Sequence, residues 1–313
     1  MDLKQLQTLL AIAEYGSASK ASQVLNVVQP ALSRQMRLLE EELGVPLFRR
    51  ERSGMNLTEA GLTLVERARR VMRELEEARA EIRPSGGVVS GIVNFGMPSS
   101  ICELLAGNLV AMVKRRHPKI RMRVHSGYAG PLQHAIQNGA LDIAIVNDPR
   151  PTPLVEARFI LKEQLVVAGP PKSGFRLDAP QPVSVLQGKP MVLPLGPHAM
   201  RSMVEHACAL ENVRLNIAAE TSAMDVQISL VLHGVGWTVL PSAAATIKVN
   251  QGVMAAAPLG GIGLQRHLAL CTPTTKCISP ATRAVKAALV DLIKSDVREG
   301  RWPGAELLDD VDG

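Results

Sequence analysis

The stretch SASKASQVLNVVQPALSRQMRLLEEELG, residues 17–44, contains two short helical patterns separated by a tight turn. Ser17 precedes the first pattern as an N-cap, and small residues on the inner face allow another helix to approach closely. The second pattern begins at Gln29-Pro30, since proline suits the first helical position, and it ends at Gly44. Its apolar stripe consists of Leu32, Met36, Leu39 and Leu43.

The opposite face of the second helix carries small and basic side chains, which are Pro30, Ser33, Arg34 and Arg37. Taken singly, each arginine is equally well explained as an ordinary solvent-exposed surface charge. Two short helices with a tight turn and arginines on the outer face of the second are typical of a DNA-binding helix-turn-helix. In the major groove, Arg34 could form a bidentate pair with guanine, Gln29 could pair with adenine, and Ser33 could donate or accept.

The flanking segments complete a predicted DNA-binding domain over residues 1–58. Before the two helices, apolar residues recur at helical spacing at Leu3, Leu6, Leu10 and Ala13. After them, residues 47–50 and 55–57 are predicted to form two short strands joined at Ser53-Gly54. This hairpin would be a basic wing, from which Arg49, Arg50 and Arg52 reach phosphates or the adjacent minor groove.

Five segments in the first 61 residues together resemble the LysR-type transcriptional regulators. They are Ala18 to Leu25, Gln29 to Gln35, Leu39 to Gly44, Leu47 to Arg50 and Leu57 to Gly61. The resemblance continues more loosely to about residue 295. It implies a winged helix-turn-helix, a linker helix, and an α/β effector domain with two lobes like those of periplasmic binding proteins. It also implies base contacts by Gln29, Pro30, Ser33 and Arg34, and wing positions for Arg50 and Arg52.

Residues 59–87 are predicted to form a long charged linker helix and a hinge, with Thr58 at the helix start. Two residues in seven are apolar along one seam, namely Leu64, Ala68, Val71, Leu75, Ala78 and Ile82. A narrow seam favours pairing with a second copy, so we expect a homodimer on a roughly dyad-symmetric DNA site. The alternative is a helix that packs on its own globular domain. Pro84-Ser85-Gly86-Gly87 would form the hinge.

From Val88 the sequence alternates between strand and helix patterns, which is typical of α/β domains. We predict a domain over residues 88–296, with lobe I from 88–162 and 267–296 and lobe II from 163–266. Two lobes joined by two crossings of the chain favour a small ligand between strand carboxyl ends and helix N-termini. The tail, residues 297–313, is rich in glycine, proline and acidic residues and is expected to be mobile.

Seven residues at predicted strand ends and helix starts are candidates for effector binding. They are Ser99, Ser100, Ala129, Asn147, His198, Arg201 and Thr221. Because Ser99 and Ser100 begin a helix, free N–H groups and two hydroxyls indicate an anion or carboxylate site, with an ordinary helix cap as the alternative. Arg201 could pair with a carboxylate or lie on the surface.

Two features refine the family resemblance in this region. The loop from Pro197 to Arg201 and residues 234–241 resemble the nitrogen-assimilation-control branch of the family. Family members commonly carry serine two residues after the glycine at the position of Gly127, whereas this chain has Ala129. The resemblance therefore implies a ligand site with one hydroxyl fewer.

Composition and charge narrow the possible functions further. The chain has 313 residues, 35 Lys+Arg and 29 Asp+Glu, a net charge of +6. Residues 1–83 hold 13 Lys+Arg and 12 Asp+Glu, so +5 remains for the rest and favours, as a hypothesis, an anionic ligand there. Aromatic residues make up 3%, which argues against a surface that stacks single-stranded bases.

Signatures of enzymes, metal sites and membrane proteins are absent from the sequence. Phosphate-binding, nucleophile-elbow and complete dinucleotide motifs do not occur. Cys102, Cys208, Cys271 and Cys277 are too few and wrongly spaced for a disulfide framework or a zinc site. The uncharged run 226–247 is broken by Gly and Pro, so we expect a helix, a turn and a buried strand there. We therefore expect no enzyme, no cofactor, no metal and no membrane association.

The sequence thus predicts a cytoplasmic, sequence-specific DNA-binding transcriptional regulator controlled by a small effector. Expected partners are double-stranded promoter DNA with a dyad-symmetric site, further copies of the chain in a homodimer or homotetramer, and RNA polymerase. Two alternatives remain open at this point. One is a ligand-binding protein or enzyme whose N-terminal segment serves assembly only, and the other is an architectural protein that binds all DNA sequences equally.

Overall fold

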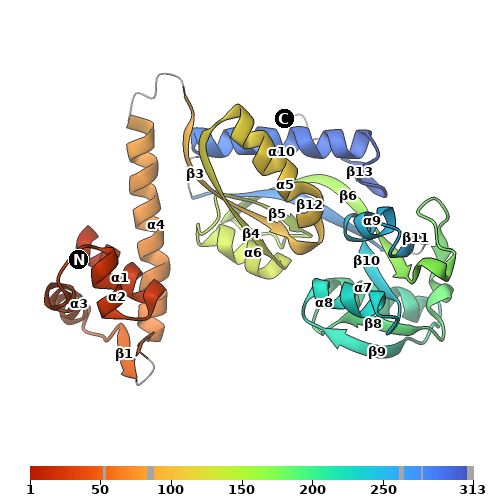
Figure 1. Ribbon diagram of the computed structural model, residues 1–313, viewed down its shortest axis with the longest axis horizontal. Coiled ribbons are helices and arrows are strands. Elements are labelled where there is room, and N and C mark those ends of the chain that lie inside the picture. Colours follow the sequence, from red (N-terminus) through yellow and green to blue (C-terminus); the bar gives the residue numbers. More distant parts are fainter. Residues whose placement is uncertain (52–53, 83–87, 261–263, 276–277, 309–313) are drawn as a thin grey trace. The chain divides into compact units, whose positions relative to one another are not determined.

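The computed structural model describes residues 1–51, 54–82, 88–260, 264–275 and 278–308 (Figure 1). The chain divides into two compact units, of which one contains Met1–Gly87 and the other contains nearly all of the chain from Val88 on. The N-terminal unit consists of α1 (Leu3–Tyr15), α2 (Ala18–Val24), α3 (Gln29–Leu43), β1 (Phe48–Glu51), β2 (Gly54–Leu57) and α4 (Glu59–Ile82). This is the predicted winged helix-turn-helix followed by a long helix.

The core of the N-terminal unit lies between α1, α3 and the start of α4. Its fully buried side chains include Leu9, Ile12, Leu32 and Leu39. The predicted stripe on α3 is correct except at Leu43, which is exposed. On α1 the buried positions are Leu6, Leu9 and Ile12 rather than the predicted Leu3 and Leu10, since the face toward α3 and α4 is centred one residue away.

Close backbone contacts hold the wing against the helices. The β1–β2 hairpin pairs Phe48 with Leu57 in antiparallel register, and Met55 N–H donates to the carbonyl of Gly16 at 3.0 Å. Gly54 has a φ of +131°, and a Cβ there would lie 2.7 Å from the Gly16 oxygen, so a larger residue would collide with the backbone. The wing is therefore fixed relative to the turn before α2.

Helix α4 begins on its own domain and then leaves it. The hydroxyl of Thr58 accepts a hydrogen bond from Gly61 N–H at 3.0 Å, as an N-cap does. Val65 and Ala68 are buried in the core of the N-terminal unit, whereas Val71 is 42% exposed and Ala78 is exposed. The alternative prediction, that the helix packs on its own domain, is therefore correct for the first turns of α4. Ala68, which was predicted to belong to the seam, is part of the core of the N-terminal unit. The side chain of Ile82 lies outside the described residues.

The C-terminal unit contains two lobes joined by long strands (Figure 1). Lobe I is built from β3 (Ser90–Pro98), α5 (Ser99–Arg116), β4 (Lys119–Gly127), α6 (Ala129–Gln137), β5 (Ile143–Asn147), β12 (Gln265–Pro273), α10 (Pro280–Arg298) and β13 (Ala305–Leu307). Lobe II is built from β7 (Gln181–Pro182), β8 (Pro190–Pro194), α7 (Ala199–Leu210), β9 (Asn216–Thr221), α8 (Met224–Leu232), β10 (Thr238–Pro241), α9 (Ser242–Asn250) and β11 (Ala255–Gly260), with short 3₁₀ turns at Pro171–Ser173 and Val183–Leu186.

Strand β6 (Val155–Gly169) belongs to both lobes. Its first part pairs with β12, and its last residues, from Leu165 on, pair with β10 and β11. The sheet of lobe I is mixed: β3 is parallel to β4 and β5, whereas β12 is antiparallel to β5 and β6. The first three strands of lobe I are therefore parallel, and the return strand β12 is antiparallel to both of its neighbours.

The described part of the C-terminal tail is ordered, so the prediction of mobility was wrong for residues 299–308. Trp302 is 1% exposed, and Ala305–Leu307 forms β13 against β6. Gly and acidic residues suggested a mobile tail, but the buried indole and the pairing with β6 outweigh that composition. Residues 309–313 lie outside the described residues.

The uncharged run 226–247 forms the end of α8, the strand β10 and the start of α9. The helix, turn and buried strand were predicted, but α9 was not. No helix in the described ranges is both long and apolar enough to cross a membrane.

Candidate DNA-binding surface and effector site

The outer face of α3 presents the residues predicted to touch bases. Gln29, Pro30 and Arg34 are exposed, and Ser33 is half-buried one turn after Gln29. Within the described residues Arg34 has neither an ion pair nor a side-chain hydrogen bond, so its five donors are available. Arg37, one turn further along, is exposed and lies 3.5 Å from the carboxylate of Glu41.

A hollow of about 440 Å³ adjoins this face. Pro30, Ser33, Arg34 and Arg37 of α3 line it together with Met55 of the wing. The four predicted α3 residues therefore share one side of the helix, as their spacing requires.

The wing carries one described basic side chain. Arg49 is exposed on β1 and has no ion-pair partner in the part of the chain that the structure describes. Arg50 continues the strand opposite Met55, but its side chain lies outside the described residues, as does the whole of Arg52. Glu40 at the end of α3 accepts the N–H groups of Leu47 and Phe48 and thereby fixes the strand that presents Arg49.

In lobe I, Ser99 and Ser100 form the first turn of α5. The N-cap is Pro98, and no side chain caps the helix. The alternative prediction, that these serines are an ordinary helix cap, is therefore wrong. Ser99 is half-buried, and Ser100 is buried with its hydroxyl 2.8 Å from a guanidinium nitrogen of Arg266.

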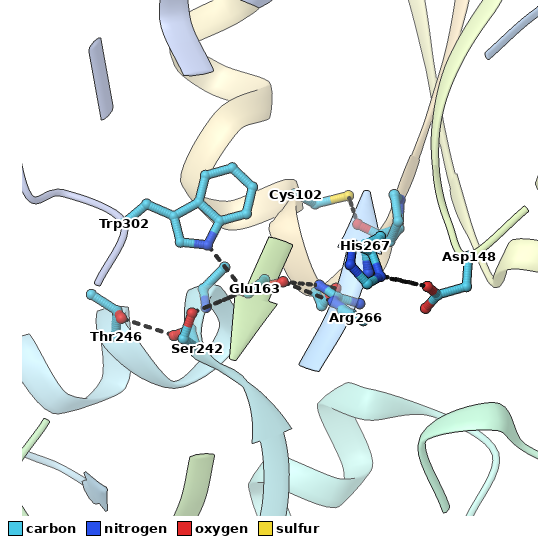
Figure 2. Close-up of polar contacts among 11 residues, drawn as sticks. Cys102, Asp148, Glu163, Ser242, Thr246, Arg266, His267 and Trp302 are labelled. Carbon is cyan, nitrogen blue, oxygen red and sulfur yellow. Dashed lines mark hydrogen bonds and ion pairs between the residues drawn. The ribbon is translucent and has the colours of Figure 1, made fainter. Parts of the chain in front are cut away.

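Arg266 lies on β12, where the chain returns from lobe II, and is 7% exposed. Figure 2 shows it beside Glu163 on β6, the residue directly opposite in the antiparallel register. The Arg266 Nε and Nη2 atoms lie 2.7 and 2.6 Å from the same Glu163 oxygen, and Glu163 has no exposure to solvent. A buried charge of this kind is stable only when it is paired and hydrogen-bonded.

His198 precedes α7 in lobe II and contacts Tyr128 of lobe I. The two rings meet edge to face with their centroids 5.1 Å apart, and the Tyr128 hydroxyl donates to the backbone carbonyl of Ser222. Burial, together with the positive charge of Arg266, lowers the pKa of His198 below its usual range, so the imidazole is neutral at pH 7. Within the described residues its buried Nδ1 has no hydrogen-bond partner.

Arg201 and Thr221 are bound to other parts of lobe II. Arg201 forms ion pairs with Glu205, at 2.7 Å, and with Glu220, and these carboxylates raise its pKa further. The hydroxyl of Thr221 accepts the N–H of Ala223 at 3.2 Å and supports the turn before α8. Two carboxylates already offset the charge of Arg201.

Asn147 and Ala129 complete the predicted set. Asn147 ends β5 opposite Leu268 and is half-buried, and Ala129 begins α6 directly after Tyr128. Of the predicted set, Ser100 contacts Arg266 and His198 contacts Tyr128, whereas Arg201 lies in a separate group of charges.

Comparison with known proteins follows the same two units. Residues 3–62 match the model described as "Bacterial regulatory helix-turn-helix protein, lysR family", and residues 86–294 match the "LysR substrate binding domain". The chain belongs to the LysR family of bacterial transcriptional regulators. This confirms the resemblance and the fold class, and it identifies the chain as a DNA-binding regulator rather than an enzyme.

Relatives of this LysR-type chain match it over nearly their full length. It is 30% identical to the HTH-type transcriptional regulator BbuR of Bordetella bronchiseptica, covering 97% of this chain and 94% of BbuR. It is 29% identical to the nitrogen assimilation regulatory protein nac of Escherichia coli, covering 96% and 98%. The structure of full-length CbnR complexed with its target DNA has a TM-score of 0.70 at 21% identity, covering 94% and 99%, and shares the fold.

Three side chains at the candidate effector site of this LysR-type chain were not predicted from the sequence. Tyr128 was not selected, yet its hydroxyl donates to the Ser222 carbonyl in the other lobe. Glu163 and Arg266 were not selected, because β6 also carries Glu156, Arg158 and Lys162, so charge alone does not distinguish the buried pair. The pair follows from the antiparallel register of β6 with β12, which the local pattern does not reveal.

Burial suppresses ionisation of the described thiols. Burial raises the pKa of Cys102, raises that of Cys208 to about 11 and raises that of Cys271 to about 12. Cys277 lies outside the described residues. The described residues contain no cluster of three or more His, Cys, Asp or Glu side chains that could hold a metal ion.

Proposed function

We propose that this chain reads a dyad-symmetric promoter site as a homo-oligomer and responds to a small anionic effector held by its C-terminal unit. The observation that carries the proposal is the outer face of α3. Arg34 lies there exposed and without an ion pair among the described residues, in the second turn of a helix that begins at Gln29. A guanidinium in this position can form a bidentate pair with guanine in the major groove.

Base reading by α3 is supported by the way its neighbours are held. Gln29, Ser33 and Arg34 project from the first turns of one rigid helix. Arg49 lies on β1, the first strand of the wing that follows this helix. Two hydrogen bonds restrain the wing: the Glu40 carboxylate accepts the N–H of Leu47, and the Gly16 carbonyl accepts the N–H of Met55. Rigid positioning of this kind favours sequence-specific recognition over equal binding to all DNA.

Pairing of two copies through α4 is supported by the second half of that helix. Beyond Ala68, which is buried in the N-terminal unit, Val71 is 42% exposed and Leu75 is half-buried. Association of two α4 helices would bury these apolar side chains. A dimer with two-fold symmetry in turn requires a DNA site with dyad symmetry. A regulator of this kind works in the cytoplasm and contacts RNA polymerase, and both remain part of the proposal.

An anionic effector is supported by the donors near Ser100. The first turn of α5 has unpaired backbone N–H groups because no side chain caps it. Ser99 and Ser100 add hydroxyls, and the Arg266 guanidinium lies 2.8 Å from Ser100. His198 of lobe II, beside Tyr128, adds a buried Nδ1 that has no hydrogen-bond partner among the described residues.

The DNA part of the proposal is tested with the full-length chain. A mobility-shift titration compares a palindromic promoter fragment with a scrambled fragment of the same length at increasing salt. We expect the specific complex to persist at moderate salt after the scrambled complex is lost. Equal affinities would favour the architectural alternative, and no complex at all would favour the ligand-binding alternative.

The effector part is tested separately by thermal-shift measurements on the same chain with sulfate, phosphate and small dicarboxylates. A ligand that binds only the folded state raises Tm by an amount that grows with the logarithm of its concentration over Kd. We expect at least one anion to do so in the unsubstituted chain and not in Ser99→Ala/Ser100→Ala. Neutral metabolites that stabilise the chain where anions do not would contradict the anionic class.

A further inference from the structure

The C-terminal segment after α10 lies along the strand that connects the two lobes. Residues 299–308 end in β13, whose Ala305 pairs with Glu163 and whose Leu307 pairs with Leu161 on β6. The N–H of Gln164 donates to the carbonyl of Gly304 at 2.9 Å, and Leu308 donates to Ile160 at 3.1 Å. We call this segment the strap.

Trp302 is the aromatic side chain of the strap, and it is buried to 1% exposure. Its indole N–H donates to Glu163 at 3.0 Å (Figure 2). The base of the strap is fixed as well, since Trp302 N–H donates to the Asp296 carbonyl at 3.1 Å, and Arg301 pairs with Asp296 at 2.7 Å.

Glu163 joins four parts of the C-terminal unit through its two carboxylate oxygens. One oxygen accepts from Trp302, from the Ser242 hydroxyl at 3.1 Å and from the Ala243 N–H at 2.7 Å, the last two at the start of α9 in lobe II. The other oxygen accepts both donors of Arg266. Through Arg266 the chain of contacts continues to Ser100 in the first turn of α5.

This arrangement has little freedom because the carboxylate is fully buried. Burying the Glu163 carboxylate is costly unless both of its oxygens accept hydrogen bonds. When one donor is lost, the carboxylate and the remaining donors therefore move to restore those hydrogen bonds. If the indole N–H is removed, rotation of the Glu163 carboxylate carries the second oxygen with it. Arg266, and with it the Ser100 hydroxyl, then loses its fixed position.

We propose that Trp302 is a positioning residue for the effector site, and that the strap sets the geometry of Arg266 and Ser100 through Glu163. This inference rests on the proposed function in one respect, namely that Ser100 contacts the effector. The mechanical coupling from Trp302 to the first turns of α5 and α9 exists whether or not a particular anion binds.

The first test uses hydrogen exchange of the ligand-free, full-length chain. Trp302→Phe keeps an aromatic ring of similar volume and removes the donor. We expect amide exchange to rise about tenfold at Ala243 at the start of α9 and in the first hydrogen-bonded amides of α5, which follow Cys102, because a hydrogen bond to a charged group is lost. Trp237→Phe is the matched control, since it removes the other tryptophan of the chain, which packs on Phe175 in lobe II.

Exchange that rises only within residues 299–308 would overturn the inference, since Trp302 would then stabilise only its own segment. An equal rise in Trp237→Phe would overturn it too.

The second test leaves Trp302 in place and serves even if Trp302→Phe does not fold. In the Trp237→Phe background Trp302 is the sole tryptophan, and Ser100→Ala should shift its emission maximum, whereas Ser99→Ala should not. An unchanged maximum in Ser100→Ala would contradict the coupling.

Sulfate then separates this inference from the proposed function. If sulfate stabilises the unsubstituted chain, its Kd should rise several-fold in Trp302→Phe and stay the same in Trp237→Phe, and an unchanged Kd in Trp302→Phe would contradict a positioning role. If sulfate has no effect on the unsubstituted chain, that result counts against the anionic effector, and the exchange and emission results still decide the role of the strap.

Discussion

Two arginines show how the surroundings of a single residue determine its role. Arg34 is exposed and has no ion pair within the described residues, so it can give its donors to DNA at little cost. Arg266 has the same side chain but is 7% exposed and is held by Glu163 on two atoms. Its charge is offset within the protein, and it acts through the geometry that it imposes on Ser100.

Arg34→Ala should lower discrimination at one base-pair position by about 1–3 kcal/mol, because the bidentate pair with a base edge is removed. Footprinting and competition with single-base variants of the promoter site would measure this change. Arg67→Ala serves as control, since Arg67 is exposed on α4 and was not predicted to touch bases. An unchanged base preference in Arg34→Ala would contradict the assignment.

The described cysteines should resist peroxide and iodoacetamide at pH 7. The thiolate is the reactive form, and a pKa raised by burial keeps Cys208, at about 11, and Cys271, at about 12, in the neutral thiol form below those values. Alkylation of Cys208, followed by mass spectrometry of the folded chain, should therefore accelerate only as the pH approaches 11. Rapid modification at pH 7 would show that the site opens to solvent.

At the scale of elements, the pairing of β6 with β12 carries a buried ion pair, Glu163 with Arg266. Glu163 and Arg266 lie opposite one another in antiparallel register, where side chains on the same face are close. Since neither partner can reach water, each depends on the other for solvation.

Glu163→Gln should lower the free energy of unfolding by about 3–5 kcal/mol, because it leaves the buried Arg266 charge without its counter-charge. Urea denaturation of the full chain measures the change. Glu163→Gln combined with Arg266→Met should regain much of the loss, since both charges are then absent. If the double variant is as unstable as the single one, the pair contributes through its shape and not through its charge.

Local patterns predicted the elements whose partners are near in sequence. The helix-turn-helix followed from the stripe at Leu32, Met36 and Leu39, because a helix of 3.6 residues per turn buries that spacing. The burial of Trp302 did not follow, because it depends on β13 pairing with β6 about 140 residues earlier in the chain. The effector site was predicted in part for the same reason: helix starts mark Ser99 and Ser100, but the contact with Arg266 depends on the sheet.

At the scale of the whole molecule, the location of charge matters more than its sum. The net charge of +6 lies mostly outside the DNA-binding unit. Much of the excess is exposed at the end of α5 and along β4, on Lys114, Arg115, Arg116, Lys119, Arg121 and Arg123. The overall charge of the C-terminal unit is therefore weak support for an anionic effector, and the donors around Ser100 provide the stronger argument.

Assembly is tested on α4, where the predicted seam emerges from the chain's own core. Val71→Asp should weaken self-association by at least tenfold in Kd, since it introduces a charge where two apolar seams are expected to meet. Sedimentation velocity over a range of concentrations measures the change. The fold of the N-terminal unit should persist, because Val71 is 42% exposed in the single chain.

Leu62→Asp is the matched control for this experiment. Leu62 is on the same helix, is apolar and 56% exposed, and lies away from the seam of Leu64, Val71 and Leu75. Self-association should be unchanged in Leu62→Asp, and binding to a two-fold promoter site should fall only in Val71→Asp, because a single recognition helix covers one half-site. Equal effects of the two substitutions would mean that α4 associates through a broader face, and no effect of either would remove α4 from the subunit interface.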